Sequence, residues 1–165
     1  MTEQDRANRA AAAMWAGDKA SHALGIALDH IAPGRAVMTM KVRPDMLNGH
    51  GICHGGFIFT VADSAFAFAC NSYNRSTVAQ QNSITYLSAA KMGEVLTATA
   101  HEVSRTGRSG IYDVCVTGPD GRQIAQFRGL SRQVRGTLFD EDLPQTQTQQ
   151  TDPLHERPDA PPRRP

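Results

Sequence analysis

Residues 48–71 read NGHGICHGGFIFTVADSAFAFACN, and the stretch changes character partway along. It opens with glycines and histidines and then becomes a nearly continuous apolar run. A helix over residues 55–71 would be apolar on almost every side, and such a helix is buried rather than amphipathic at a surface. One carboxylate, Asp63, interrupts the run. A carboxylate there is costly unless it is hydrogen-bonded, paired, protonated or open to a water-filled pocket.

Strand-like segments lie on both sides of this helix. Residues 35–43 alternate between apolar and polar side chains, which is typical of a half-buried strand. Residues 25–31 form a shorter strand-like segment before them. Pro119-Asp120-Gly121 is a turn signal between two later strands. Strands before and after one buried helix predict an α+β fold, with an antiparallel sheet wrapped around one long central helix. The four later segments are residues 77–87, 94–105, 110–117 and 122–135.

The chain divides into three parts by composition. Residues 1–23 are alanine-rich and predict an N-terminal helical extension, a helix over about residues 5–23 that packs through Met14 and Trp15. Residues 24–136 hold the central helix and the strands. Residues 137–165 carry six of the nine prolines and many glutamines, so we predict a disordered polar tail.

Composition excludes several classes of function. The formal net charge of the 165 residues is +1, which gives no broad attraction to nucleic acid or to an anionic membrane. The apolar run from residue 57 to residue 70 is shorter than the roughly 20 residues that a membrane-spanning helix needs. Three cysteines, an odd number without a CxxC pair, indicate reduced thiols in a cytoplasmic protein and no zinc site of that type. We expect no metal and no cofactor.

The start of the predicted helix is suited to binding an oxyanion. Gly55 and Gly56 let a ligand approach the backbone closely, although they also serve a tight turn. The first turn of a helix presents N–H groups without an internal partner at the positive end of the helix dipole. Such donors stabilise negative charge that develops on a carbonyl oxygen.

The spacing of Gly55 and Asp63 predicts a dimer. Eight residues of helix separate them by about 12 Å, whereas two groups that act on one carbonyl lie within roughly 3–4 Å of it. One helix cannot bring them together. Two antiparallel helices related by a two-fold axis can, with Gly55 of one subunit opposite Asp63 of the other.

Polar residues in the preceding loop complete the predicted site. The amide of Asn48 can orient a water or a carboxylate, and His54 can donate to a carbonyl or act as an acid. His54 adjoins the helix and is therefore preferred over His50. The alternative is that Asn48 is a turn residue and that the histidines form loop-stabilising hydrogen bonds.

Six arginines lie between residues 105 and 135 and are mostly expected at the solvated surface. Together they are suited to binding the phosphates of a nucleotide-bearing substrate. Arg108 and Arg132 are the candidates that we place at the substrate. The six are Arg105, Arg108, Arg122, Arg128, Arg132 and Arg135.

These motifs resemble the hotdog-fold acyl-CoA thioesterases, specifically the phenylacetic-acid-degradation (PaaI) type. The long motif at residues 48–56 and the Ala62-Asp63-Ser64-Ala65 segment carry the resemblance, which extends over about residues 24–135. Shorter similar segments are Ile84-Thr85-Tyr86-Leu87, Gly93-Glu94-Val95-Leu96, Tyr112-Asp113-Val114 and Phe127-Arg128-Gly129.

The resemblance implies a dimer that pairs sheet edges, commonly a homotetramer, and thioester hydrolysis that releases coenzyme A. It implies that Asp63 is the catalytic carboxylate, that the Gly55 amide of the partner polarises the thioester carbonyl, and that Asn48 and His54 line the site. Some relatives carry a serine or threonine where Ala79 aligns here, and Gln81 is the candidate substitute.

The expected substrates are aryl-acetyl thioesters such as phenylacetyl-CoA or hydroxyphenylacetyl-CoA, in phenylacetate catabolism. Asp63 either attacks directly or activates water, and the sequence does not choose between these routes. A non-catalytic acyl-CoA-binding module and a hydratase or dehydratase of the same fold are the alternatives. The acyl pocket is expected to involve Gly56 and Tyr86, with Phe57, Phe59 and Phe66 as candidates that are equally at home in the core.

Overall fold

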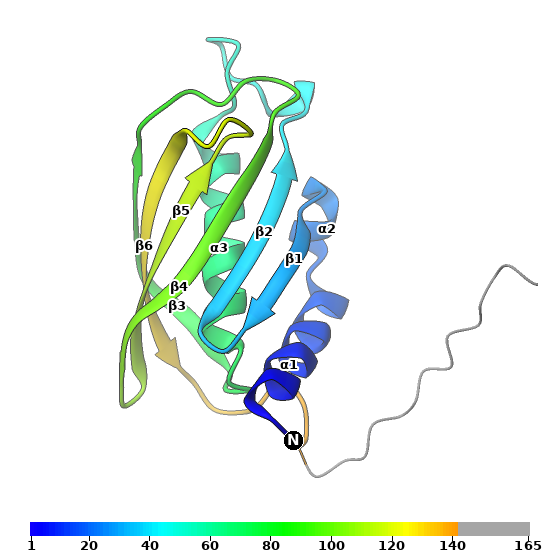
Figure 1. The fold of residues 1–165 in the computed structure, drawn as a ribbon, viewed down its shortest axis with the longest axis vertical. Coiled ribbons are helices and arrows are strands. Elements are labelled where there is room, and N and C mark those ends of the chain that lie inside the picture. The colour runs from blue at the N-terminus through cyan, green and yellow to red at the C-terminus, as the bar shows by residue number, and fades with distance from the viewer. Residues whose placement is uncertain (142–165) are drawn as a thin grey trace, which may run out of the picture.

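The structure is a computed structural model that describes residues 1–141. One antiparallel sheet of six strands curves around a single long helix, α3 (Gly55–Asn71) (Figure 1). The predicted α+β architecture is therefore confirmed. The strands are β1 (Ala27–Ala32), β2 (Arg35–Lys41), β3 (Thr77–Tyr86), β4 (Val95–Thr106), β5 (Ser109–Thr117) and β6 (Gln123–Gln133).

The helix α3 forms where the glycine-rich loop ends. The ring Nδ1 of His54 accepts a hydrogen bond from the Gly56 N–H at 3.0 Å, which satisfies one of the unpaired donors of the first turn. At the other end, the side-chain amide of Asn71 donates to the carbonyls of Ala67 and Thr77 and accepts from the Thr77 N–H. Asn71 thus joins the end of α3 to the beginning of β3.

The core lies between α3 and the concave face of the sheet. Alternate residues of β2, β4 and β5 are fully buried there, as the period-two pattern predicts. Aromatic side chains fill the centre, with the Phe66 ring 5.7 Å from that of Tyr112 and 5.8 Å from that of Phe127. The backbone of β6 comes close to this cluster, because a Cβ on Gly129 would lie 2.6 Å from the Phe66 ring.

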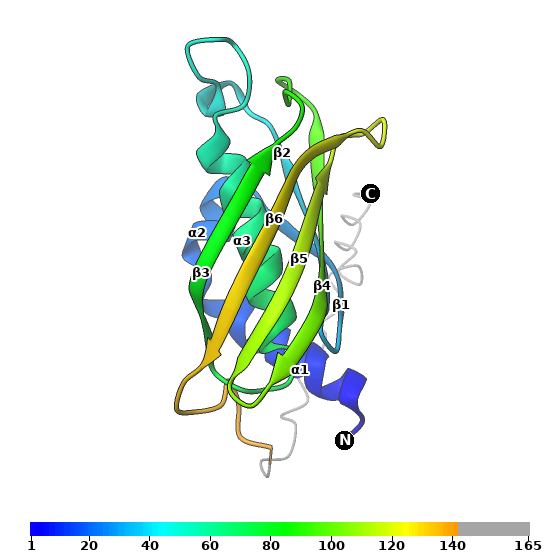
Figure 2. The same ribbon diagram turned by 90° about the vertical axis from the view of Figure 1, so that its left-hand side faces the viewer.

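The sheet has the strand order β1-β2-β4-β5-β6-β3. Figure 2 shows β3 at one edge, and within the described residues β6 is its only strand partner. Two large side chains near the ends of this edge are half exposed, Val78 at 50% and Tyr86 at 49%. An unpaired strand edge presents a row of N–H and C=O groups to solvent or to another chain.

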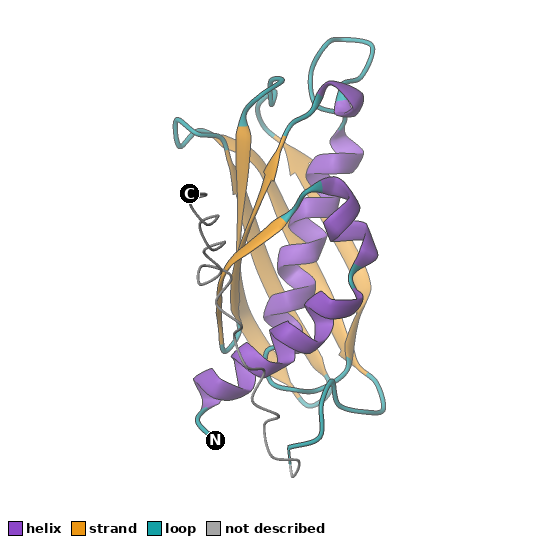
Figure 3. Ribbon diagram, turned by 90° about the vertical axis from the view of Figure 1, so that its right-hand side faces the viewer, coloured by secondary structure: helices purple, strands orange, loops and turns teal. Residues whose placement is uncertain are grey.

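The N-terminal segment differs from the single helix that the sequence predicts over residues 5–23. It forms two helices, α1 (Glu3–Gly17) and α2 (Lys19–Leu24), which run beside β1 and α3 (Figure 3). The break occurs because Asp18 adopts non-helical backbone angles and its carboxylate accepts from the Ser21 N–H. Trp15 packs against the core as expected, 5.9 Å from the Phe68 ring.

Most of the predicted tail, residues 142–165, lies outside the described residues. The first part, residues 137–141, is held against the domain. The side chain of Asn74 accepts from the N–H groups of Leu138 and Phe139 and donates to the Phe139 carbonyl. Glu141 forms an ion pair of 2.8 Å with Arg6 of α1. No helix among residues 1–141 is long and apolar enough to cross a membrane.

Candidate active site

Asp63 lies on the side of α3 that faces β3. It is half-buried, and the Asn82 side-chain amide donates a hydrogen bond of 2.8 Å to its Oδ1. Burial raises the pKa of the Asp63 carboxyl above its ordinary value, and the Asn82 hydrogen bond offsets part of that rise. The carboxylate therefore lies beside the free edge of the sheet, with one neutral donor as its hydrogen-bond partner among the described residues.

Gly55 begins α3, and its N–H makes no hydrogen bond to any residue of the described chain. The Tyr86 hydroxyl donates to the Gly55 carbonyl at 2.9 Å. Its ring is so close that a Cβ on Gly55 would lie 2.9 Å from Tyr86 Cζ. Gly55 thus offers a free backbone donor at the positive end of the helix, next to an aromatic ring.

His54 is exposed, and its ring is oriented by the Gly56 N–H. Because Nδ1 accepts that hydrogen bond, the neutral ring carries its proton on Nε2. Nε2–H is therefore available as a donor near the start of α3. His50 is also exposed, and the structure gives its ring no comparable anchor within residues 1–141.

Asn48 shapes the loop that leads to the helix. Its side-chain Oδ1 accepts from the N–H groups of His50 at 2.9 Å and Ile52 at 3.4 Å, so the turn role weighed from the sequence is present. Asn48, Gly55 and Tyr86 line one open pocket of about 450 Å³. The remaining residues that line it are Ile52, Cys53, Ile58, Leu87, Ser88, Ala89 and Ala90.

Asp63 is not part of this pocket in one chain. Along β3, Tyr86 lies level with Gly55, to which it is hydrogen-bonded, and Asn82 lies level with Asp63, to which it is also hydrogen-bonded. Four strand residues span about 13 Å, which matches the ~12 Å of eight helical residues. The single subunit therefore keeps the carboxylate and the free amide apart, as the spacing argument predicts.

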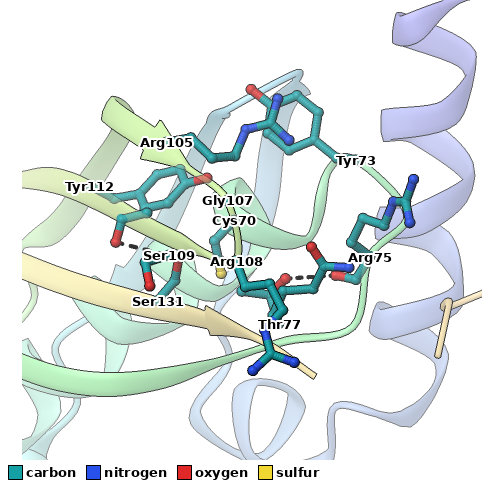
Figure 4. A pocket seen from close by; sticks show the side chains of 12 residues that line it. Cys70, Tyr73, Arg75, Thr77, Arg105, Gly107, Arg108, Ser109, Tyr112 and Ser131 are labelled. Atoms are coloured by element: carbon teal, nitrogen blue, oxygen red, sulfur yellow. Dashed lines mark hydrogen bonds between the residues drawn. The ribbon is translucent and has the colours of Figure 1, made fainter. Parts of the chain in front are cut away.

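Arg108 and Arg132, the two arginines predicted to contact the substrate, lie at the far end of the sheet from Gly55. On β6, Arg132 pairs with Val78, whereas Ala125 pairs with Tyr86. Arg132 donates to the Ser109 hydroxyl at 3.1 Å. Arg108 lines a small hollow beside Cys70, in which the guanidinium groups do not converge (Figure 4). The structure does not bring Arg108 or Arg132 to the Gly55 pocket of the same chain.

The predicted aromatic and polar pocket residues have mixed positions. Phe66 is fully buried, and Phe59 packs 5.5 Å from the Phe127 ring, so both belong to the core. Phe57 is half-buried near His54. Gln81 is exposed beside an irregularity in the pairing of β3 and β6, and among the described residues the hydrogen bond to Asp63 comes from Asn82 instead.

Asn82, the hydrogen-bond donor to Asp63, is a neighbour of the candidate site that the sequence alone did not indicate. The register of β3 against β6 shifts between Ala79 and Gln81, and this bulge moves the inward-facing positions by one residue. Asn82, rather than Gln81, consequently faces the helix. Tyr86 belongs to a segment that resembles the family, and its side chain reaches Gly55. Alternation counted backward from Tyr86 would have placed residue 82 on the inner face.

Within residues 1–141, no group of three or more His, Cys, Asp or Glu side chains is arranged to hold a metal ion. The three cysteines are free, and burial raises the pKa of the Cys70 thiol to about 12. The titratable group on α3 that faces the sheet edge is therefore Asp63. The chemistry that the site offers is that of one carboxylate, one backbone donor and one histidine.

Residues 50–125 match the thioesterase superfamily. The chain is 41% identical to the acyl-coenzyme A thioesterase PaaI of Escherichia coli over 129 residues, which are 78% of this chain and 92% of that protein. The structure of the E. coli PaaI protein from the phenylacetic acid degradation operon superposes with a TM-score of 0.81 at 40% identity, over 82% of this chain and 99% of that one. A thioesterase protein from Streptococcus pneumoniae, solved with coenzyme A, gives a TM-score of 0.65 at 29% identity, over 68% of this chain and 87% of that one.

Proposed function

We propose that aryl-acetyl thioesters are the substrates of this chain. It belongs to the thioesterase superfamily and is a hotdog-fold acyl-CoA thioesterase of the PaaI type. Phenylacetyl-CoA and hydroxyphenylacetyl-CoA are the named candidates, with phenylacetate catabolism as the pathway. The observation that supports the choice is the similarity to PaaI over 92% of that protein's length. An open pocket lined by Tyr86 and by apolar side chains such as Ile52, Ile58 and Leu87 suits a flat aromatic group.

The active site is proposed to form between two subunits. The free edge of β3 supplies a surface on which a second β3 can pair. A two-fold axis at Ile84 places Tyr86 of the partner subunit opposite Asn82. Tyr86 is hydrogen-bonded to Gly55 of its own chain, and Asn82 to Asp63. This register therefore brings Gly55 of the partner subunit to the level of Asp63.

In this arrangement each group has one role in hydrolysis. The Gly55 N–H of the partner subunit donates to the thioester carbonyl oxygen and stabilises the charge that develops there. Asp63 either attacks the carbonyl carbon or removes a proton from the attacking water. The C–S bond breaks, and coenzyme A leaves as the thiol once it has gained a proton. No cofactor is needed, because coenzyme A is part of the substrate.

The remaining predicted residues surround this centre. His54 is proposed to donate through Nε2 to the substrate, and Asn48 and Gly56 to shape the loop on which the thioester lies. Arg108 and Arg132 are proposed to bind phosphates of coenzyme A. The two-fold axis supports this role, since it carries the Arg132 end of one sheet toward residues 87–90 of the partner's pocket.

We further propose a homotetramer built from two such dimers and a cytoplasmic location. The free thiols support the location, because oxidising compartments favour disulfides. The oligomeric state is measured by light scattering of the purified chain. A monomer at assay concentration would contradict the composite site itself.

A panel of acyl-CoA thioesters tests the substrate assignment, with release of free thiol followed in a spectrophotometer. We expect kcat/KM for phenylacetyl-CoA and its hydroxylated forms to exceed that for straight-chain acyl groups of similar size. Faster turnover of straight chains would reject the aryl-acetyl assignment while leaving the thioesterase activity intact. Binding without turnover of any thioester would favour the acyl-CoA-binding alternative, and addition of water to an enoyl-CoA would favour the hydratase.

A further inference from the structure

Asn82 carries an unusual buried atom. Its side-chain nitrogen donates to Asp63, but its side-chain oxygen Oδ1 is buried without any hydrogen-bond partner. Among the side chains of residues 1–141 it is the one buried nitrogen or oxygen atom left in this state. Native structures leave few such atoms, since an unsatisfied buried acceptor costs about 1–3 kcal/mol. An atom that is kept in this way beside a candidate catalytic carboxylate calls for a partner in the working site.

The orientation of the Asn82 amide follows from the charge of Asp63. An ionised carboxylate only accepts hydrogen bonds, so the NH₂ group must face Asp63 and the oxygen must face away from that contact. One carboxylate oxygen, Oδ1, is thereby held. The second oxygen, Oδ2, receives no hydrogen bond from the described residues. Two acceptors on neighbouring side chains, Asp63 Oδ2 and Asn82 Oδ1, therefore have no donor. A single molecule with two donor hydrogens, such as water, can satisfy both.

We propose that Asn82 is a positioning residue for the hydrolysis, which holds Asp63 through its NH₂ group and the attacking water through its Oδ1. The inference rests on the proposed function. The water donates one hydrogen to Asp63 and the other to Asn82, so that its lone pair faces the thioester carbon. The nucleophile is consequently water, and Asp63 is a general base.

The proposed step balances. The water oxygen forms a bond to the carbonyl carbon while one water proton moves to Asp63, and the carbonyl oxygen takes up negative charge opposite the Gly55 N–H of the partner subunit. The C–S bond then breaks as the C=O bond re-forms. The sulfur of coenzyme A takes the proton from Asp63, which restores the carboxylate. The products are the free acid and the thiol.

The electrostatic surroundings of Asp63 make the role of the amide measurable. On its own helix the titratable neighbour is Cys70, whose thiol feels the Asp63 charge. From β3 the contacting group is the neutral Asn82, and across the proposed interface it is His54 of the partner subunit. The Asn82 donor holds the pKa of Asp63 below the value that burial alone would give. Removing the donor should therefore shift the acidic limb of the pH–rate profile upward.

Two substitutions separate the two halves of the amide. Asn82→Leu removes the donor and the acceptor, and we expect kcat to fall about 10²-fold at every pH, with little change in KM and an acidic limb at higher pH. Asn82→Asp keeps an acceptor oxygen and replaces the donor with a second carboxylate. We expect its acidic limb to shift further upward, because adjacent carboxylates share a proton, and its kcat above that limb to exceed that of Asn82→Leu.

The control is Ser104→Val, which changes an exposed residue of β4 outside the proposed β3 interface and should keep the wild-type profile. Wild-type kcat and acidic limb in folded Asn82→Leu would overturn the proposal. So would dissociation of Asn82→Leu to monomers in light scattering, since Oδ1 would then bind the partner subunit rather than water.

Single turnover in ¹⁸O-labelled water should place the label in the product acid, and label in Asp63 would overturn the water role. Absence of any thioesterase activity in the wild type would instead reject the proposed function.

Discussion

Asp63, the proposed catalytic carboxylate, is expected to reduce the stability of the fold when it is charged. Its folded-state pKa lies above the unfolded value because burial disfavours the charged form. The folded state therefore binds the proton more tightly than the unfolded state does. Stability contributed by the protonated form is present below the unfolded pKa and is lost as the pH rises through the folded pKa.

We expect Asp63→Asn to unfold at a higher temperature than the wild type at pH 7 while losing hydrolysis. The substitution removes a buried charge and keeps an oxygen that accepts from Asn82. The difference should disappear near pH 3.8, the ordinary value for the carboxyl. Thermal unfolding of both proteins at one protomer concentration and several pH values provides the measurement. A less stable variant at pH 7 would show that Asp63 is paired more strongly than the Asn82 contact implies.

A substitution can remove the N–H group of Gly55 without disrupting helix α3. Proline is favoured at the first position of a helix, and His54 already has the extended angles that a residue before proline requires, φ −63° and ψ 133°. We expect Gly55→Pro to lower kcat/KM about 10²–10³-fold through loss of the donor. Gly55→Ala is the matched control, because both variants add a Cβ that displaces Tyr86 and alanine keeps the N–H. Equal losses in the two variants would assign the effect to Tyr86.

At the level of single residues, the sequence predicts candidate site residues but not all of their neighbours. Asp63, Gly55 and His54 stand out because glycine, histidine and a lone carboxylate are conspicuous in an apolar helix and its approach loop. Asn82 is missed when the alternation is counted forward from Ala79, because a one-residue bulge between Ala79 and Gln81 interrupts it. A bulge depends on pairing between strands that are distant in sequence.

At the scale of elements, apolar patterning predicts most of the fold. The helix α3 begins and ends where its glycines and Asn71 indicate, and the later strands agree with their predicted ranges to within about two residues. The break between α1 and α2 is less visible, since alanine favours helix on both sides of Asp18. The side-chain contact that makes Asp18 a cap becomes apparent only in the structure.

The close contact between β6 and α3 gives a test of packing. Gly129→Ala places a Cβ 2.6 Å from the buried Phe66 ring, which is held by Tyr112 and Phe127. We expect the free energy of unfolding to fall by about 1–3 kcal/mol. Gly17→Ala is the control, because a Cβ there meets nothing within 4 Å, and its stability should be equal or slightly higher. Urea titration measures both, and an unchanged midpoint for Gly129→Ala would mean that Phe66 can move aside.

At the scale of the whole molecule, the site is proposed to be completed by a second copy. Asp63→Asn and Gly55→Pro should each inactivate the homodimer. In a heterodimer of the two variants, one site contains both substitutions and the other contains neither. We expect heterodimers isolated through two different affinity tags to regain about half of the wild-type activity. Heterodimers as inactive as either parent would place the whole site within one chain.

The open edge of β3 has a consequence for the life of the protein before it assembles. A newly made subunit exposes a strand edge with half-exposed Val78 and Tyr86, which is the kind of surface that recruits foreign strands into aggregates. Pairing with a second copy would cover that edge in the same event that completes the catalytic centre. Selection for turnover and selection against misassembly would then act on the same ten residues, Thr77–Tyr86.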